Sequence, residues 1–223
     1  MTSSDLIYDP ATHTSRTPDG RDVPHVTHIL KACGISADFE ALAEMSRRIG
    51  DAIEAARILG SVVHEDAHAY DDGDLDLSTV HELSRPYLDA WATFRVNLKL
   101  SPLVRERRVY HSGLDYVGIL DGIFHQRGTG KQILVDIKTS ASLGNAAADR
   151  LQVAAYEMAW LDQYPDGPIG IDERWVVYLR PASAVPYRVV NCSAEPGAWR
   201  DGQKFAACVT VFRLQKGGHQ CLT

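Results

Sequence analysis

YVGILDGIFHQRGTGKQILVDIKT, residues 116–139, has the pattern of two strands joined by a tight turn. Residues typical of strands fill 116–125 and 132–138, and the Gly-rich residues 127–130 between them are typical of a turn. With the turn centred on residues 128 and 129, Asp121 lies directly opposite Asp136. Lys138 stands two residues beyond Asp136 and shares its face, because side chains alternate along a strand. The stretch therefore predicts two carboxylates and an ammonium group on one patch of a hairpin.

This combination of charges predicts a metal site. Carboxylates that face each other, or that lie among apolar residues, are destabilising unless they are paired or bind a cation. Carboxylate oxygens are natural ligands of hard divalent cations, and Lys138 would then polarise a water molecule or stabilise charge on phosphate. The alternative is an Asp–Lys ion pair on a solvated edge, but the apolar residues at 133–135 and 137 predict a buried central strand.

The flanking sequence predicts helices before the hairpin and a second set of strands after it. Residues 1–24 are polar and predict a flexible N-terminal arm, and 25–33 predict a short ordered segment. The remaining expected elements are helices at 38–70 (with a potential break at Gly60), 79–98, 147–163 and 198–215, and strands at 103–110, 174–179 and 187–190. This order predicts an α/β chain of mixed α+β type, with a central mixed sheet flanked by helices.

Composition narrows the class of protein. The chain has 223 residues, of which 45% are hydrophobic, and a formal net charge of −6. The negative charge argues against a protein that coats nucleic acid by charge alone, but it is compatible with a nuclease whose bound cation offsets clustered carboxylates. No apolar run is long enough for a membrane span, and no secretory signal is present, so we expect a soluble, cytoplasmic protein.

Four sequence motifs, which follow one another along the chain in the expected order, resemble the PD-(D/E)xK nuclease superfamily, and within it the RecB-like and phage-exonuclease branch. Gly118-x-x-Asp121 resembles its G-x-x-D motif, and residues 136–139 (DIKT) resemble its D-x-K-T motif. Gln152-x-x-x-Tyr156 resembles its Q-x-x-x-Y helix motif, and Gly60-x-x-x-His64 resembles its helical motif with a metal-binding histidine. Together the motifs span residues 60–156. The resemblance implies a restriction-endonuclease-like core, formed here by one nuclease domain over residues 25–223 with a helical N-terminal part.

The resemblance also implies roles for single residues. Asp121, Asp136 and His64 would bind Mg²⁺ or Mn²⁺, with the backbone carbonyl of Ile137 as a further ligand, and Asp121, Asp136 and Lys138 would be catalytic. Gln152 and Tyr156 would contact DNA or brace the site, and Glu106 in the preceding strand would bind or orient a metal.

The same resemblance implies a biological setting. Resemblance to this branch implies an exonuclease that processes DNA ends in recombination or repair and is encoded by a phage. Its implied partners are DNA and a recombination protein. Some relatives carry a four-cysteine iron–sulfur cluster, but the spacing of Cys33, Cys192, Cys208 and Cys221 does not fit that pattern, so we expect no iron–sulfur cluster. Exonuclease or endonuclease action, strand polarity and oligomeric state stay open at this point.

Two other functions compete with this hypothesis. Residues 64–68 (HEDAH) match the zinc-protease pattern H-E-x-x-H, in which His64 and His68 would hold zinc and Glu65 would act as general base. That hypothesis leaves the hairpin charges unexplained, and in the nuclease hypothesis His68 is structural and points past the hairpin. The third hypothesis is a catalytically inactive nucleic-acid-binding protein, against which the intact Asp, Asp and Lys set argues.

Overall fold

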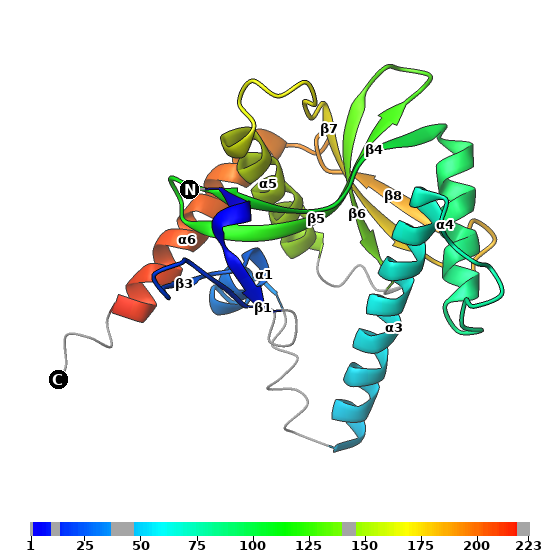
Figure 1. Cartoon of the computed structure of the whole chain (residues 1–223), viewed down its shortest axis with the longest axis horizontal. Helices are drawn as coiled ribbons and strands as arrows, with labels where there is room; N and C mark the ends of the chain where they lie inside the picture. Colours follow the sequence, from blue (N-terminus) through cyan, green and yellow to red (C-terminus); the bar gives the residue numbers. More distant parts are fainter. Residues whose placement is uncertain (1, 10–13, 37–46, 140–145, 218–223) are drawn as a thin grey trace.

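A five-stranded mixed sheet forms the centre of the molecule in a computed structural model, which describes residues 2–9, 14–36, 47–139 and 146–217 (Figure 1). Its strands lie in the order β4-β5-β6-β7-β8. Their bounds are β4 Leu100–His111, β5 Tyr116–Gln126, β6 Gln132–Lys138, β7 Glu173–Leu179 and β8 Tyr187–Asn191. Neighbouring strands are antiparallel except β6 and β7, which are parallel. The predicted mixed sheet flanked by helices is confirmed.

Helices cover both faces of this sheet. Helices α1 (Val26–Ala32), α5 (Ala146–Gln163) and α6 (Asp201–Gly217, after the 3₁₀ turn η2 Ala198–Arg200) cover one face, and α3 (Arg47–Asp72) and α4 (Arg85–Asn97) cover the other. Parallel strands need a crossover connection, and α5 provides it between β6 and β7. Strand β6 is buried on both faces, so it is the central strand that its apolar residues predict.

The predicted register of the β5–β6 hairpin is confirmed. Four residue pairs, from His125↔Gln132 to Gly122↔Val135, follow it along the two strands. The paired ladder ends there, so Asp121 and Asp136 are the first residues beyond it. The hairpin therefore opens at the point where its two carboxylates stand.

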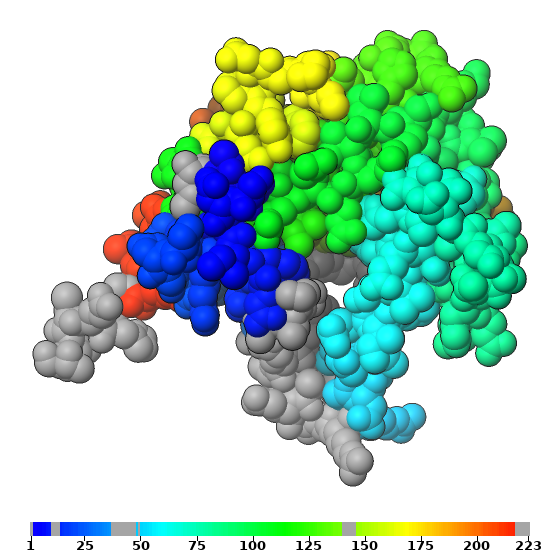
Figure 2. Space-filling model, viewed as in Figure 1, coloured from blue at the N-terminus to red at the C-terminus, as the bar shows by residue number. Residues whose placement is uncertain are grey.

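The N-terminal residues form structure that their composition does not predict. The 3₁₀ turn η1 (Ser3–Asp5) precedes a small antiparallel sheet of β1 (Ile7–Asp9), β2 (Thr14–Arg16) and β3 (Asp22–Val23). Leu6 and Val23 are buried against Tyr110 and Val117, and Figure 2 shows this segment (blue) lying against the body of the molecule. The prediction of a flexible arm over 1–24 is wrong for the described residues, because strands of two or three residues carry too short a pattern to recognise.

Two helix predictions also need correction. Gly60 does not break its helix, because α3 is continuous through it. Glycine lowers helix propensity by only about 1 kcal/mol, which tertiary packing overcomes. Helix α4 begins at Arg85, six residues after the predicted start, because turns occupy residues 77–79 and 82–84. Residues 38–46 of the predicted first helix, and Cys221, lie outside the described residues.

Among the helices that the structure describes, none is long and apolar enough to cross a membrane.

Candidate metal centre

The open end of the β5–β6 hairpin places Asp121 and Asp136 in different surroundings. Oδ2 of Asp121 accepts a hydrogen bond from the backbone amide of Ile137 at 2.7 Å. That bond replaces the next rung of the ladder with a side chain from β5. Asp136 is only 2% exposed, and its Oδ2 has no hydrogen-bond partner among the described residues. The hairpin thus holds one carboxylate that is tied to the backbone and one that is buried and unsatisfied.

Helix α3 brings His64 to the same point. Its Nδ1 lies 3.2 Å from Oδ1 of Asp121. Val63 and Ala67 on the same helix are fully buried against the sheet, which anchors the helix at this position. The structure brings these two predicted metal ligands together, although they stand 57 residues apart in the chain, and their metal role stays a prediction.

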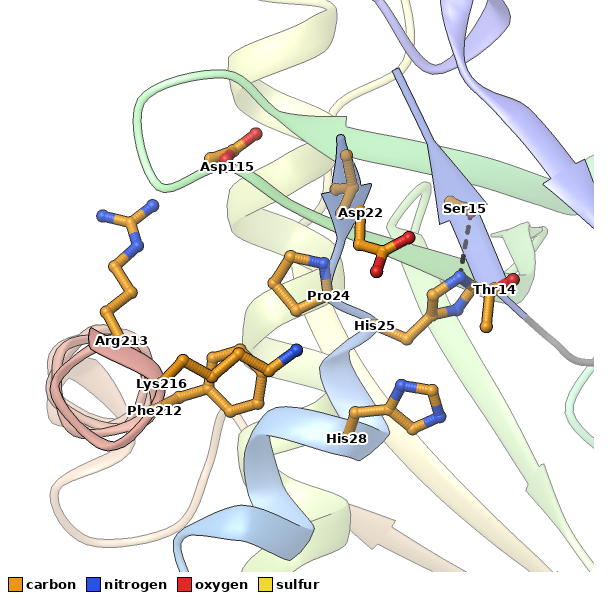
Figure 3. A pocket seen from close by; sticks show the side chains of 11 residues that line it. Thr14, Ser15, Asp22, Pro24, His25, His28, Asp115, Phe212, Arg213 and Lys216 are labelled. Atoms are coloured by element: carbon orange, nitrogen blue, oxygen red, sulfur yellow. Dashed lines mark hydrogen bonds between the residues drawn. The ribbon is translucent and has the colours of Figure 1, made fainter. Parts of the chain in front are cut away.

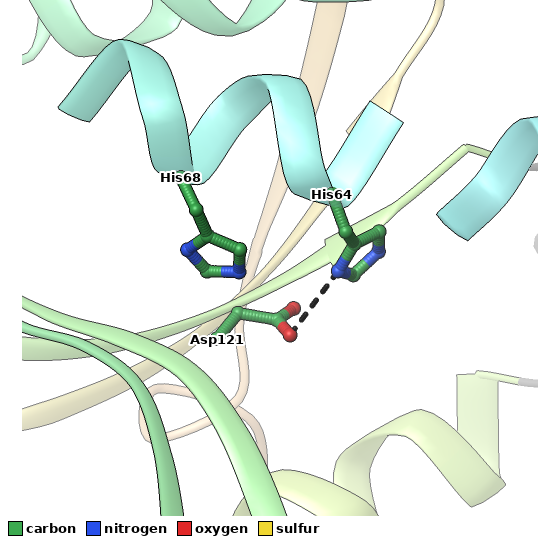
Figure 4. Close-up of side chains that lie close together, drawn as sticks. All are labelled: His64, His68 and Asp121. Carbon is green, nitrogen blue, oxygen red and sulfur yellow. Dashed lines mark ion pairs between the residues drawn. The ribbon is translucent and has the colours of Figure 1, made fainter. Parts of the chain in front are cut away.

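His68 joins this pair, contrary to the prediction that it points past the hairpin. Figure 4 shows both imidazole rings extending from α3 toward Asp121. Ligand atoms of His64, His68 and Asp121 all lie within 4.8 Å of one another, close enough to hold one metal ion. The signal for His68 was its spacing, since residues at i and i+4 share a helix face.

Lys138 occupies the other side of Asp136. Its Nζ lies 2.9 Å from Oδ2 of Asp136, without the angles of a hydrogen bond, and it donates a hydrogen bond to Oε1 of Gln152 at 3.0 Å. Gln152 in turn donates from Nε2 to the hydroxyl of Tyr156 at 2.7 Å. The two residues of the Q-x-x-x-Y motif therefore brace the ammonium group from α5.

Asp149 is a member of the site that the sequence analysis missed. It lies on α5 with Oδ1 3.9 Å from Nζ of Lys138, and its Oδ2 accepts a hydrogen bond from the hydroxyl of Tyr178 at 2.6 Å. Asp149 precedes Gln152 by three residues and Tyr156 by seven, so all three lie on one helix face. That periodicity was the available signal.

Burial and mutual repulsion control the charges of the carboxylates. Burial, with the neighbouring charges of Asp121 and Asp149, raises the pKa of Asp136 to about 6 although Lys138 opposes the shift. Burial also acts to raise the pKa of Asp121, but His64 and the Ile137 amide outweigh it, so this pKa is lowered. Burial opposes the charged form of His64, yet Asp121 and Asp136 raise its pKa overall. A bound cation would complete the compensation of the Asp136 charge.

The residues present fit a divalent cation. The carboxylate of Asp121 and the imidazole of His64 belong to a group of ligand atoms close enough for one ion, and such donors suit Mg²⁺ or Mn²⁺. Asp136 lies outside that group, but its buried, unsatisfied Oδ2 is a further oxygen donor beside it. The Ile137 amide is committed to Asp121, and the role of the Ile137 carbonyl as a further ligand stays a prediction.

Glu106 is not brought into this group. It is exposed, its φ is 26°, and it falls between the pairs Arg105↔Gly122 and Arg107↔Leu120 without a partner in that ladder. Among the causes that raise the pKa of Tyr8 on β1, burial is the largest, and the negative charge of Glu106 is the second. The register on either side places Glu106 opposite Asp121, but its left-handed backbone and exposed side chain keep it out of the group that His64, His68 and Asp121 form. Its metal role stays a prediction.

A separate cavity of about 280 Å³ lies between the N-terminal strands, α1 and α6 (Figure 3). Within it, Oγ of Ser15 and Nε2 of His25 are 2.9 Å apart. Ser15 is 1% exposed. This cavity shares no lining residue with the candidate metal centre.

Comparisons with known proteins give little beyond this geometry. No protein family matches the sequence, and no curated protein matches it. The crystal structure of SSO0001 is similar to this chain with a TM-score of 0.38 and 17% sequence identity, over 84% of this chain and 75% of that chain. A similarity this weak carries no argument about function.

Proposed function

We propose that this chain is a DNA nuclease that requires Mg²⁺ or Mn²⁺ and hydrolyses phosphodiester bonds. The observation that carries the proposal is the convergence of Asp121, Asp136 and Lys138 at the open end of the hairpin, where Oδ2 of Asp136 is buried without a hydrogen bond. Asp121, Asp136 and His64 would hold the cation. When bound, it would polarise the scissile phosphate and lower the pKa of a water molecule.

The remaining residues would position and stabilise the reacting groups. Lys138 is the one ammonium group that the described site contains, and it is held by Asp136 and Gln152. It would donate a hydrogen bond to the attacking water or to the phosphate oxygen on which negative charge develops. Tyr156, through Gln152, would keep the ammonium group at this position.

Cleavage at DNA ends is the specific form of the proposal. The four-motif resemblance to RecB-like and phage exonucleases supports exonuclease action in recombination or repair, with DNA as substrate and a recombination protein as partner. A protein with this role, including one encoded by a phage, would act in the cytoplasm. These steps rest on analogy with a family rather than on contacts of the site.

Digestion of end-labelled linear DNA beside a covalently closed circle tests the proposal. We expect loss of the linear substrate with Mg²⁺ or Mn²⁺, an intact circle, and no cleavage by Asp136→Asn. Cleavage of the circle would contradict exonuclease action alone. DNA binding without cleavage of either substrate, with every divalent cation tried, would favour the inactive nucleic-acid-binding hypothesis.

A zinc protease remains the second candidate, because His64, His68 and Asp121 form a three-ligand group. The exposed Glu65 would then be the general base. Stoichiometric zinc in the purified protein, with proteolysis abolished by Glu65→Gln and unaffected by Asp136→Asn, would support this function over the nuclease. We expect no proteolysis, because the protease hypothesis gives no role to Asp136 or Lys138.

A further inference from the structure

Two imidazoles, rather than one, face the candidate metal centre. His64 and His68 are one turn apart on α3, with ring centroids 6.4 Å apart, and both have a ligand atom within 4.8 Å of the Asp121 carboxylate. The helix that carries them is continuous through Gly60 and is held on the sheet by fully buried Val63 and Ala67. Each histidine directly follows one of these anchors, so the packing of α3 positions both rings together.

The number of imidazoles influences which cation a site prefers. Mg²⁺ demands oxygen ligands in near-ideal octahedral geometry and keeps much of its hydration. First-row transition ions accept imidazole nitrogen readily, and their affinity for a nitrogen-containing site generally rises along the series that starts with Mn²⁺. A site with one imidazole among carboxylates suits either kind of ion. A second imidazole at the same cation shifts the preference from Mg²⁺ toward a first-row transition ion.

We propose that His68 is a further ligand of the metal ion, and that the site prefers Mn²⁺ or another first-row transition ion to Mg²⁺. The proposal rests on the metal site of the proposed nuclease and specifies its cofactor. It requires no movement of α3, because His68 already lies with His64 and Asp121 (Figure 4). Both rings are partly exposed, so a cation can reach them from solvent.

Calorimetric titration of metal-free protein with Mn²⁺ and with Mg²⁺ tests the proposal without any measurement of cleavage. We expect the wild type to bind Mn²⁺ more tightly than Mg²⁺. His68→Ala should weaken Mn²⁺ binding by at least about tenfold, since even residues that only orient a ligand cost about that much. Mg²⁺ binding should change less. His68→Gln keeps an oxygen donor, so it should lose the Mn²⁺ preference while retaining Mg²⁺ affinity.

His81→Ala is the matched control, because His81 is exposed and lies outside the group. It should leave both affinities unchanged. Circular dichroism and melting temperature will show that each variant folds. The visible spectrum of bound Co²⁺ gives a second readout, which should change in His68→Ala and not in His81→Ala.

An unchanged ratio of Mn²⁺ to Mg²⁺ affinity in folded His68→Ala and His68→Gln would overturn the inference. DNA cleavage supported by Mg²⁺ in that case would leave the proposed function intact. Conversely, a Mn²⁺ preference that depends on His68, in a protein that cleaves no DNA, would uphold the inference while the proposed function fails.

Discussion

Nζ of Lys138 lies 2.9 Å from Oδ2 of Asp136, on the same strand and two residues away, yet that oxygen receives no well-aligned hydrogen bond. The ammonium group donates instead to Gln152 and also faces Asp149. Lys138 is therefore shared among three partners and cannot by itself satisfy the buried carboxylate. The arrangement leaves an unsatisfied carboxylate oxygen beside an ammonium group that is already positioned.

Replacement of Lys138 by alanine should separate catalysis from metal binding. We expect Lys138→Ala to lose cleavage by roughly 10²–10³-fold, the usual cost of removing one group that stabilises developing charge. It should still bind Mn²⁺, because the ammonium group is not a ligand. Single-turnover cleavage and calorimetric titration measure the two effects.

Lys131→Ala is the control for this experiment, because Lys131 is a lysine of the same hairpin that pairs with Glu173 far from the carboxylates. It should leave cleavage and Mn²⁺ binding nearly unchanged. Loss of Mn²⁺ binding in Lys138→Ala, with binding retained in Asp121→Ala, would reverse the assigned roles.

Asp149→Asn should act through Lys138 as a positioning residue. Burial opposes the charged form of Lys138, but Asp136 and then Asp149 outweigh it and raise the pKa of the lysine. Removal of the Asp149 charge should leave the ammonium group less firmly held beside Asp136, without changing its charge near neutral pH. We expect kcat to fall about 10–100-fold with little change in KM, as for other residues that orient a reactive group.

Tyr178→Phe provides the comparison for Asp149→Asn. It removes the hydrogen bond to Oδ2 of Asp149 but retains the carboxylate charge. Its effect on kcat should therefore be smaller. An unchanged kcat in folded Asp149→Asn would show that Asp149 has no part in the reaction.

Stabilisation by metal should increase with pH. The folded-state pKa of Asp136 is raised from 3.8 to about 6, so the folded protein binds a proton more tightly than the unfolded chain. The contribution of Asp136 to the free energy of unfolding is therefore largest below about pH 4 and declines as the pH rises to about 6. Above that pH the buried carboxyl group of Asp136 is fully ionised. His64 then also loses more readily the proton that would compete with a cation for its ring nitrogen. Mn²⁺ should raise the melting temperature more at about pH 8 than at about pH 5.

Asp136→Asn should abolish most of this pH dependence, because the amide carries no titrating charge. Scanning calorimetry of both proteins, with and without Mn²⁺, measures it. An equal increase in melting temperature at both pH values in the wild type would contradict the assignment of Asp136 as a ligand.

The two motif glycines should respond differently to alanine. A Cβ at Gly118 would lie 2.5 Å from Cε1 of Tyr156, so Gly118→Ala must displace the ring and should destabilise the fold by about 1–3 kcal/mol. A Cβ at Gly60 would lie 3.5 Å from Oγ1 of Thr139, an ordinary contact. Gly60→Ala should therefore stabilise α3 by roughly 0.5–1 kcal/mol. Urea unfolding of both variants measures the difference, and equal destabilisation would contradict it.

Local pattern was sufficient for the strands and for the register of the hairpin. Strand β6 begins and ends at the predicted residues, 132 and 138, and the predicted register holds from Gly122↔Val135 outward. Alternation of side chains and a Gly-rich turn are properties of neighbouring residues, so they can be read without the rest of the molecule. The shared face of Asp136 and Lys138 follows from the same short-range rule.

Contacts between distant segments decided the rest of the site. Helical spacing places His64 and His68 on one face, but only the packing of Val63 and Ala67 on the sheet turns that face toward Asp121. The register of β4 and β5 alone would set Glu106 opposite Asp121, but its local backbone, with φ of 26°, leaves its side chain exposed and outside the group.

Asp149 and the N-terminal strands show the same division. Asp149 becomes part of the site because α5 crosses the sheet beside Lys138 and Tyr178. The strands β1 to β3 have a buried side because Leu6 and Val23 pack against Tyr110 and Val117. A sequence pattern specifies which residues share a face of one element, whereas the free energy of burial between elements far apart in the chain decides what that face meets.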